Sequence, residues 1–314
     1  MTSAVIDLGS NTVRMCVFDY HNDEITTVFS TKENLGLAGQ VTDGVLPSES
    51  IQNVCEVLKH FHTLALKFVS ENDVHAFTTA IFRKIDNKEE AMEQIKLDPG
   101  ITPEHLSGKE EARLSFVGVK HATGRQSGFM LDVGGASTEL VSFADGEIER
   151  VTSTTVGCLE LFSKHVRTLV VTDQIKKSIK AEIDKAFNKF DLAKLKSVTL
   201  IGVGVTARTA LKMSKAMFGT DKEDYSFPTE HLRNIRKGLQ KHSPEVYRTL
   251  YRVSPDRIVT FFPGLLIIEE AVKRLRSKEF YVSKYGVREG YYIDRILKLD
   301  TISNVSNKAT ESTP

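Results

Sequence analysis

The chain has 314 residues, of which 40% are hydrophobic, and its 42 Lys and Arg residues nearly balance 41 Asp and Glu residues. This length suits two domains with separate cores, and the near-zero net charge argues against a DNA-coating protein while leaving room for a local basic cleft. The three cysteines form no CxxC pair, and no apolar run approaches the roughly 20 residues of a membrane span. We therefore expect a cytoplasmic protein with no DNA or membrane partner.

The chain opens with three predicted strands, at residues 3–8, 12–19 and 25–31, joined as antiparallel hairpins. The first turn suits phosphate, because its glycine lets backbone N–H groups approach an anion and its hydroxyls are donors. The residues of this turn are Asp7, Gly9, Ser10, Asn11 and Thr12. Arg14 follows within an otherwise apolar strand, where it is either an edge residue in solvent or, as we favour, a guanidinium that grips phosphate.

A long helix is predicted at residues 48–70, capped by Ser48 or Ser50, and is followed by a strand at 74–80 and a helix at 87–97.

The next predicted helix begins after Ser107 and continues to about residue 120. Ser107 and Glu110 have the spacing of a capping box, which explains the first acid of this helix but not the second, Glu111. The polar residues 121–128 are interpreted as a domain boundary.

An apolar strand at residues 128–131 leads into a second glycine turn, and further strands are predicted at 137–144 and 147–155. Two carboxylates, Asp132 and Glu139, flank this turn. The turn itself consists of Gly134, Gly135, Ala136, Ser137 and Thr138. Carboxylates beside a phosphate cradle suit Mg²⁺, which binds a few carboxylates together with water and substrate oxygens. The alternative is a glycine-rich hairpin with a solvated acid at each end.

The two turns align at one offset (132 − 7 = 125), which pairs Gly9 with Gly134 and Thr12 with Ser137. A repeat at this distance has the size of a domain. Two similar domains that face each other would present two phosphate loops to one cleft.

The predicted helix at residues 172–190 is basic and amphipathic, and we interpret it as a solvated face. Residues 197–207 match the G-x-G-x-x-A pattern of dinucleotide-binding folds and lead into a predicted helix at 205–217. We reject that interpretation, because a polar loop at 219–225 follows where a second parallel strand is needed. The remaining predictions are helices at 229–240, 244–251, 263–276 and 288–299, a strand at 280–283 and a disordered tail at 301–314.

The segments Ile6–Arg14 and Asp132–Glu139 resemble the exopolyphosphatase and guanosine pentaphosphate phosphatase (Ppx/GppA) family, within the actin and sugar-kinase superfamily. The segments around Arg83, Glu111 and Gly204 resemble that family as well. The resemblance implies an α/β fold of two actin-like (ribonuclease H-like) domains with a cleft between them. Each domain would have a mixed sheet of about five strands flanked by helices. The implied domains are residues 1–124 and 125–290, with a C-terminal helix at 288–300 returning to the first.

By the same resemblance, Glu111 is the general base that activates water for attack on a terminal phosphate. The implied ligands of Mg²⁺, or of another divalent cation, are Asp132, Glu139 and Asp7. The implied phosphate and substrate contacts are the turn residues 9–12 and 134–138 together with Arg14, Arg83, Gly204 and Thr206. The implied substrates are inorganic polyphosphate and guanosine pentaphosphate (pppGpp), which would connect the protein to the stringent response. Near the C-terminus, Arg288 and Glu289 either pair with each other or contact substrate.

Two residues depart from the family pattern, since Ala136 and Val205 stand where glycines are usual. A positive φ at Ala136 would impose strain of about 1 kcal/mol or more. These departures keep a second hypothesis open, namely a weakly active or inactive regulatory protein that binds (p)ppGpp. A third hypothesis is an ATP-using kinase or ATPase of the same superfold, and formation of a homodimer is also left open.

Overall fold

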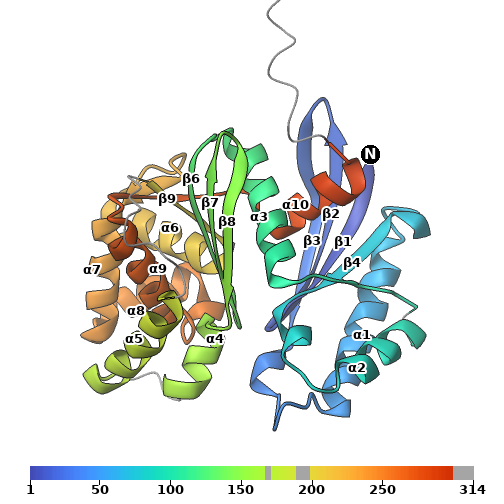
Figure 1. Ribbon diagram of the computed structural model, residues 1–314, viewed down its shortest axis with the longest axis horizontal. Helices are drawn as coiled ribbons and strands as arrows, with labels where there is room; N and C mark the ends of the chain where they lie inside the picture. The colour runs from blue at the N-terminus through green and yellow to red at the C-terminus, as the bar shows by residue number, and fades with distance from the viewer. Residues whose placement is uncertain (99, 167–170, 189–198, 300–314) are drawn as a thin grey trace, which may run out of the picture.

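The computed structural model describes residues 1–98, 100–166, 171–188 and 199–299, so the predicted tail lies outside the described residues. Figure 1 shows two α/β halves side by side, each built on one sheet. The predicted fold class, two mixed sheets flanked by helices, is therefore confirmed.

The first half contains a five-stranded sheet with the order β3-β2-β1-β4-β5. Its strands are β1 (Thr2–Leu8), β2 (Thr12–His21), β3 (Glu24–Asn34), β4 (Val74–Thr78) and β5 (Glu104–His105). The first three strands are antiparallel, as the short turns between them require, and β4 and β5 continue the sheet in parallel. Helices α1 (Ser48–Ala65) and α2 (Lys88–Leu97) enclose one apolar core with this sheet.

The second half repeats this topology, with one additional strand. Its strands are β6 (Gly128–Val133), β7 (Thr138–Ala144), β8 (Glu147–Thr154), β9 (Thr199–Val203), β10 (Ser226–Pro228) and β11 (Glu279–Val282), in the order β10-β11-β9-β6-β7-β8. β10 is the strand that follows the glycine turn at residues 202–204, and it is antiparallel to β11. This agrees with our rejection of a dinucleotide-binding unit, which needs a parallel strand after the helix.

Five long helices pack with the second sheet around the largest apolar core. They are α5 (Asp173–Phe187), α6 (Gly204–Phe218), α7 (Thr229–Gln240), α8 (Pro244–Val253) and α9 (Phe261–Leu275). A short helix, α4 (Cys158–Leu161), follows β8 and lies against α9.

The first long helix, α1, begins at the predicted residue but differs from its prediction in its C-terminal end and in its cap. It ends at Ala65, because the following residues leave the core, and Leu66 and Phe68 are 43% and 41% exposed. Neither predicted serine caps it, since the residue before the helix is Pro47 and no side chain bonds to the first turn. Ser50 instead donates a hydrogen bond to Oε1 of Gln40 (2.6 Å).

Helix α3 (Gly108–Thr123) lies between the two sheets, as Figure 1 shows. Leu114 and Val117 pack into a core with the first sheet, whereas Phe116 and Val119 pack into a core with the second. The predicted cap at its start is present, because Ser107 Oγ accepts a hydrogen bond from the backbone N–H of Glu110 (3.1 Å). The N-terminal end of α3 is therefore held between the two halves of the molecule.

The C-terminal helix α10 (Val287–Tyr291) continues as a π-helical segment, Tyr292–Leu297, and packs against α3. Tyr291 and Tyr292 are buried in the core that the first sheet forms with α3. The end of the described chain thus lies on the first half, although β11 directly before it belongs to the second. None of the helices in the described part of the chain combines the length and apolar character needed to cross a membrane.

Candidate active site

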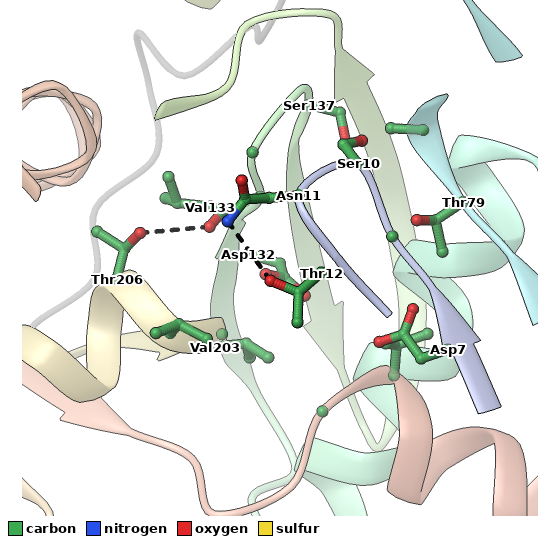
Figure 2. Close-up of a pocket in the computed structure, with 18 of the residues that line it drawn as sticks. Asp7, Ser10, Asn11, Thr12, Thr79, Asp132, Val133, Ser137, Val203 and Thr206 are labelled. Atoms are coloured by element: carbon green, nitrogen blue, oxygen red, sulfur yellow. Dashed lines mark hydrogen bonds between the residues drawn. The ribbon is translucent and has the colours of Figure 1, made fainter. Parts of the chain in front are cut away.

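One cleft lies between the two halves and is lined by both glycine turns. Figure 2 shows Asp7, Ser10, Asn11 and Thr12 from the first half and Asp132, Ser137 and Thr206 from the second around this one pocket. The tips of the two turns approach each other, since a methyl group placed on Gly135 would lie 3.8 Å from Cβ of Ser10. The repeated sequence is therefore a pair of loops that share one cleft.

The two turns have the same backbone geometry. The N–H of Gly9 donates to the carbonyl of Thr12 (3.2 Å), and the N–H of Gly134 donates to the carbonyl of Ser137 (3.0 Å). Ala136 is buried and is not among the residues with positive φ, so its Cβ imposes no backbone strain. The concern that the sequence raised at this position therefore does not apply.

Gly157 fixes the position of the second turn. Its backbone lies so close that an added Cβ would be 2.4 Å from the carbonyl oxygen of Gly135 and from the nitrogen of Ala136. The N–H groups of Leu159 and Glu160 donate to the Gly135 carbonyl (2.9 and 3.1 Å) at the start of α4. The glycine is thus needed for this close contact with the loop.

The third glycine turn approaches a carboxylate. Gly204 has φ +84°, and an added Cβ there would lie 2.8 Å from Oδ1 of Asp132, so only glycine fits. Val205 follows in the first turn of α6 and has no positive φ. Thr206 donates a hydrogen bond to the carbonyl of Val133 (3.5 Å), a contact that Figure 2 marks.

Four buried or nearly buried carboxylates lie around the inner end of the cleft: Asp7, Glu111, Asp132 and Glu139. Burial raises the pKa of Asp7 to about 6, although the guanidinium groups of Arg288 and Arg14 oppose the shift. Burial also raises the pKa of Glu111 to about 7, against the opposing effect of Arg83. The pKa of Glu139 is well above its usual range because of burial and of the neighbouring Glu111 and Asp132.

Glu111 stands at the N-terminal end of α3 and lines the cleft that both turns share. Its Oε2 accepts a hydrogen bond from Nη1 of Arg83 (2.7 Å), and the same Nη1 donates to the carbonyl of Leu106 (3.0 Å). The Glu111 side chain is 14% exposed. A carboxylate that is held in place and has a pKa near 7 is suited to accept a proton from water at neutral pH.

Three predicted site residues do not line the cleft. Arg83 pairs with Glu111 and reaches towards Ser137 (3.5 Å) instead of facing the cavity. Thr138 is buried and donates its hydrogen bond to the carbonyl of Val156 (2.7 Å). Glu139 is buried behind the turn, where Ser153 Oγ donates to its Oε1 (2.9 Å). The other predicted site residues, including Gly204 and Thr206, line the cleft.

Among the described residues, no three His, Cys, Asp or Glu side chains form a group that could hold a metal ion. The predicted ligand set of Asp132, Glu139 and Asp7 is thus not formed as a three-carboxylate cage. Asp132 remains suited to Mg²⁺, because it lines the cleft, its Oδ2 accepts from Ser115 (3.1 Å), and it has no ion pair among the described residues. Mg²⁺ commonly binds through one or two carboxylates together with water and substrate phosphate oxygens, which this arrangement fits.

Four arginines line the cleft from four different elements, and we call them the arginine cluster: Arg14, Arg208, Arg257 and Arg288. From the sequence we predicted Arg14 as a phosphate contact and left the partner of Arg288 open. We did not predict a role for Arg208 or Arg257. Arg288 pairs with Asp7 (3.5 Å) instead of Glu289, whose carboxylate accepts from the N–H of Gly286 (2.8 Å). Burial and neighbouring arginines lower the pKa of Arg208 to about 10.

Two nitrogens of the arginine cluster lack partners. The Nε atoms of Arg257 and Arg288 are buried and have no hydrogen-bond acceptor among the described residues. Buried donors without acceptors are uncommon in proteins, and an anionic ligand would satisfy them. The lining of the cleft therefore carries both carboxylates and guanidinium groups, and Asp7 and Arg288 pair directly.

Comparisons with known proteins identify relatives of this chain in sequence and in fold. The chain is 25% identical over 313 residues to the proteins named Exopolyphosphatase 1 of Mycobacterium tuberculosis and Mycobacterium bovis, an alignment that covers 94% of this chain and 88% of each relative. The fold is similar to that of an exopolyphosphatase from Cytophaga hutchinsonii, with a TM-score of 0.82, 23% identity and coverage of 96% and 100%. It is also similar to a Ppx/GppA family member from Aquifex aeolicus, with a TM-score of 0.78, 23% identity and coverage of 95% and 98%. The sequence profile of the Ppx/GppA phosphatase family matches residues 16–299, and the chain belongs to that family.

Proposed function

We propose that this protein is an exopolyphosphatase, which releases the terminal phosphate of inorganic polyphosphate by attack of a water molecule. The observation that carries the proposal is the position of Glu111, in a cleft lined by two phosphate-type loops and the arginine cluster. The two Mycobacterium relatives named as exopolyphosphatases support this assignment.

In the proposed reaction, the Glu111 carboxylate accepts a proton from water while the water oxygen forms a bond to the terminal phosphorus. The bond from that phosphorus to the bridging oxygen breaks, and the shortened chain leaves with the electron pair. Arg83 holds Glu111 in place, and the backbone N–H groups of the two turns bind the phosphate oxygens. Asp132 would hold Mg²⁺, which supplies charge neutralisation between phosphate oxygens when it is bound.

Polyphosphate is the favoured substrate over pppGpp because the residues that line the cleft include no aromatic side chain in the described part of the chain. Proteins that bind nucleobases commonly stack them on aromatic rings, and each such contact contributes about 1–3 kcal/mol. The lining offers hydroxyls, backbone N–H groups and guanidinium groups, all of which can donate hydrogen bonds to phosphate oxygens.

The test is a comparison of phosphate release from tripolyphosphate, long-chain polyphosphate and pppGpp, each with and without Mg²⁺. We expect kcat/KM for both polyphosphates to exceed the value for pppGpp. Absence of turnover of all three, with pppGpp bound tightly, would overturn the proposal in favour of a regulatory binding protein. Rapid ATP hydrolysis would instead favour a kinase-like or ATPase activity.

A further inference from the structure

The exposed end of the arginine cluster continues into a row of charges across the first sheet. Asp7 on β1 is paired in register with Arg14 on β2, and Arg14 is paired in register with Lys32 on β3. Side chains directly opposite one another on neighbouring strands lie on the same face of a sheet. Nη1 of Arg14 also donates to Ser30 Oγ (3.3 Å), which confirms that Arg14 lies over β3 on this face.

This row leads outward from the inner end of the cleft. Adjacent strands lie roughly 4.8 Å apart, so Lys32 is about two strand spacings from Asp7. Asp7 and Arg14 line the cleft, whereas Lys32 lies outside the lining and its side chain is 35% exposed. The cationic surface therefore extends from the arginine cluster to the rim of the first half.

One carboxylate occupies the outer end of this row. Asp256 lies in the 3₁₀ turn Pro255–Arg257 of the second half, directly before Arg257 of the arginine cluster, and its Oδ2 forms an ion pair with Nζ of Lys32. The Asp256 side chain is 47% exposed. Lys32, Arg257 and Arg14 all lower its pKa, so it is surrounded by the cations that a polyanion would need.

The position of the Asp256 carboxylate matters when the substrate is a long polyphosphate chain. An exopolyphosphatase binds the end of its substrate at the reacting site, and the rest of the chain has to leave the cleft past its rim. Each further phosphate carries negative charge and is attracted to exposed Lys and Arg side chains but repelled by a carboxylate. Exposed ion pairs such as Lys32–Asp256 contribute little to stability, so a polyanion can displace the carboxylate.

We propose that Lys32 and the arginine cluster guide the polyphosphate chain out of the cleft, and that Asp256 opposes long chains by occupying Lys32. Tripolyphosphate ends within the arginine cluster, whereas a longer chain continues to Lys32 and competes with Asp256. Asp256 and Lys32 are thus residues that determine preference for chain length. This inference depends on the proposed exopolyphosphatase activity.

The test measures KM for long-chain polyphosphate and for tripolyphosphate in two variants. Asp256→Asn should lower KM for the long chain by about threefold to fivefold, because it frees Lys32, and should leave KM for tripolyphosphate unchanged. Lys32→Gln should raise KM for the long chain by a similar factor. Both effects should decrease at high salt, since they act between exposed charges.

A second exposed pair offers a matched control. Nζ of Lys84 in the first half pairs with Glu160 in the second (2.5 Å), and neither residue lines the cleft or belongs to the row. Glu160→Gln removes the same kind of charge from the same kind of contact and should leave the ratio of the two KM values unchanged.

The outcomes separate the two proposals. Absence of phosphate release from both tripolyphosphate and long-chain polyphosphate by the wild-type protein would overturn the proposed function itself. If the wild-type protein is active, the test is the ratio of KM for long-chain polyphosphate to KM for tripolyphosphate. The same ratio in wild type, Asp256→Asn and Lys32→Gln would overturn the proposed chain path alone. An equal change in Glu160→Gln would also overturn it, because the effect would then reflect general charge. Turnover of tripolyphosphate shows in each case that the variant is folded.

Discussion

Arg14 and Glu139 occupy equivalent positions in the two repeated hairpins. Their separation equals that of the two aspartates (139 − 14 = 125 and 132 − 7 = 125), and the register pairs Asp7 with Arg14 but Asp132 with Glu139. The same architecture thus places a cation beside the first aspartate and a second acid beside the other. The equivalent positions of the two hairpins therefore carry opposite charges, although both turns line the same cleft.

Arg14→Gln should weaken catalysis for polyphosphates of every length. Hydrogen bonds to charged groups contribute about 1.5–3 kcal/mol, so we expect a decrease in kcat/KM of roughly tenfold to a hundredfold. Steady-state kinetics with tripolyphosphate measure this decrease. Arg233→Gln on α7, which removes an exposed arginine outside the cleft, is the matched control and should retain wild-type kinetics. An unchanged kcat/KM in Arg14→Gln would exclude a phosphate contact at this position.

The pH profile should reveal the state of Glu111. Its pKa is raised to about 7 by burial, so kcat/KM should fall below that pH as the base becomes protonated. Arg83 opposes this shift, and Arg83→Gln should therefore move the acidic limb of the profile to higher pH. A pH–rate series of both proteins measures the limb. A limb that moves to lower pH in Arg83→Gln would contradict the assigned pairing.

The same carboxyl group should affect stability with a defined sign. Because the folded-state pKa of Glu111 is about 7 and the ordinary value is 4.5, the folded protein binds the proton more tightly between these values. The stability that Glu111 contributes is hence present below pH 4.5 and is lost as the pH rises to about 7. Glu111→Gln cannot titrate, so its stability relative to wild type should rise across this window by on the order of 1–3 kcal/mol. Denaturant unfolding of both proteins at pH 4.5 and 7.5 measures their free energies of unfolding. A difference between variant and wild type that is the same at both pH values, or that is smaller at pH 7.5, would contradict the raised pKa of Glu111.

Gly157→Ala should damage the second phosphate loop. The added Cβ would lie 2.4 Å from backbone atoms of Gly135 and Ala136, which cannot move without displacing the loop. We expect a loss of stability of about 1–3 kcal/mol, with a decrease in phosphate release that persists under conditions where the variant is folded. Gly39→Ala is the control, because Gly39 is exposed and nothing lies within 4 Å of its Cβ position, so its effect should stay within about 0.5 kcal/mol. Equal effects of the two substitutions would show that the loop contact is unimportant.

Much of the architecture was predictable because it depends on local patterns. The strand periodicity, the Asp-x-Gly turns and their common offset depend on residues that are close in sequence, and the two sheets follow from them. The position of Glu111 was also predictable, since it is the acid that capping of α3 leaves unexplained.

The arginine cluster was only partly predictable, because its members come from four elements that the chain folding brings together. Arg208 lies four residues after Gly204 on α6, a spacing of one helical turn from the glycine, and that signal could have indicated it. Arg257 lies in a polar turn with no motif of its own. Thr138 and Glu139 are adjacent on β7 and point to its opposite faces, and both are buried because β7 is covered on both faces. A hydroxyl-rich turn does not reveal that the strand after it is covered in this way.

The most direct test of the account is the turnover of tripolyphosphate by Glu111→Gln, together with calorimetric binding of the same substrate. A positioned general base contributes roughly 10²–10⁴-fold to rate, so we predict a decrease in kcat of this size with binding retained. Phosphate release by Glu111→Gln at the wild-type rate would contradict the central claim that Glu111 activates the attacking water.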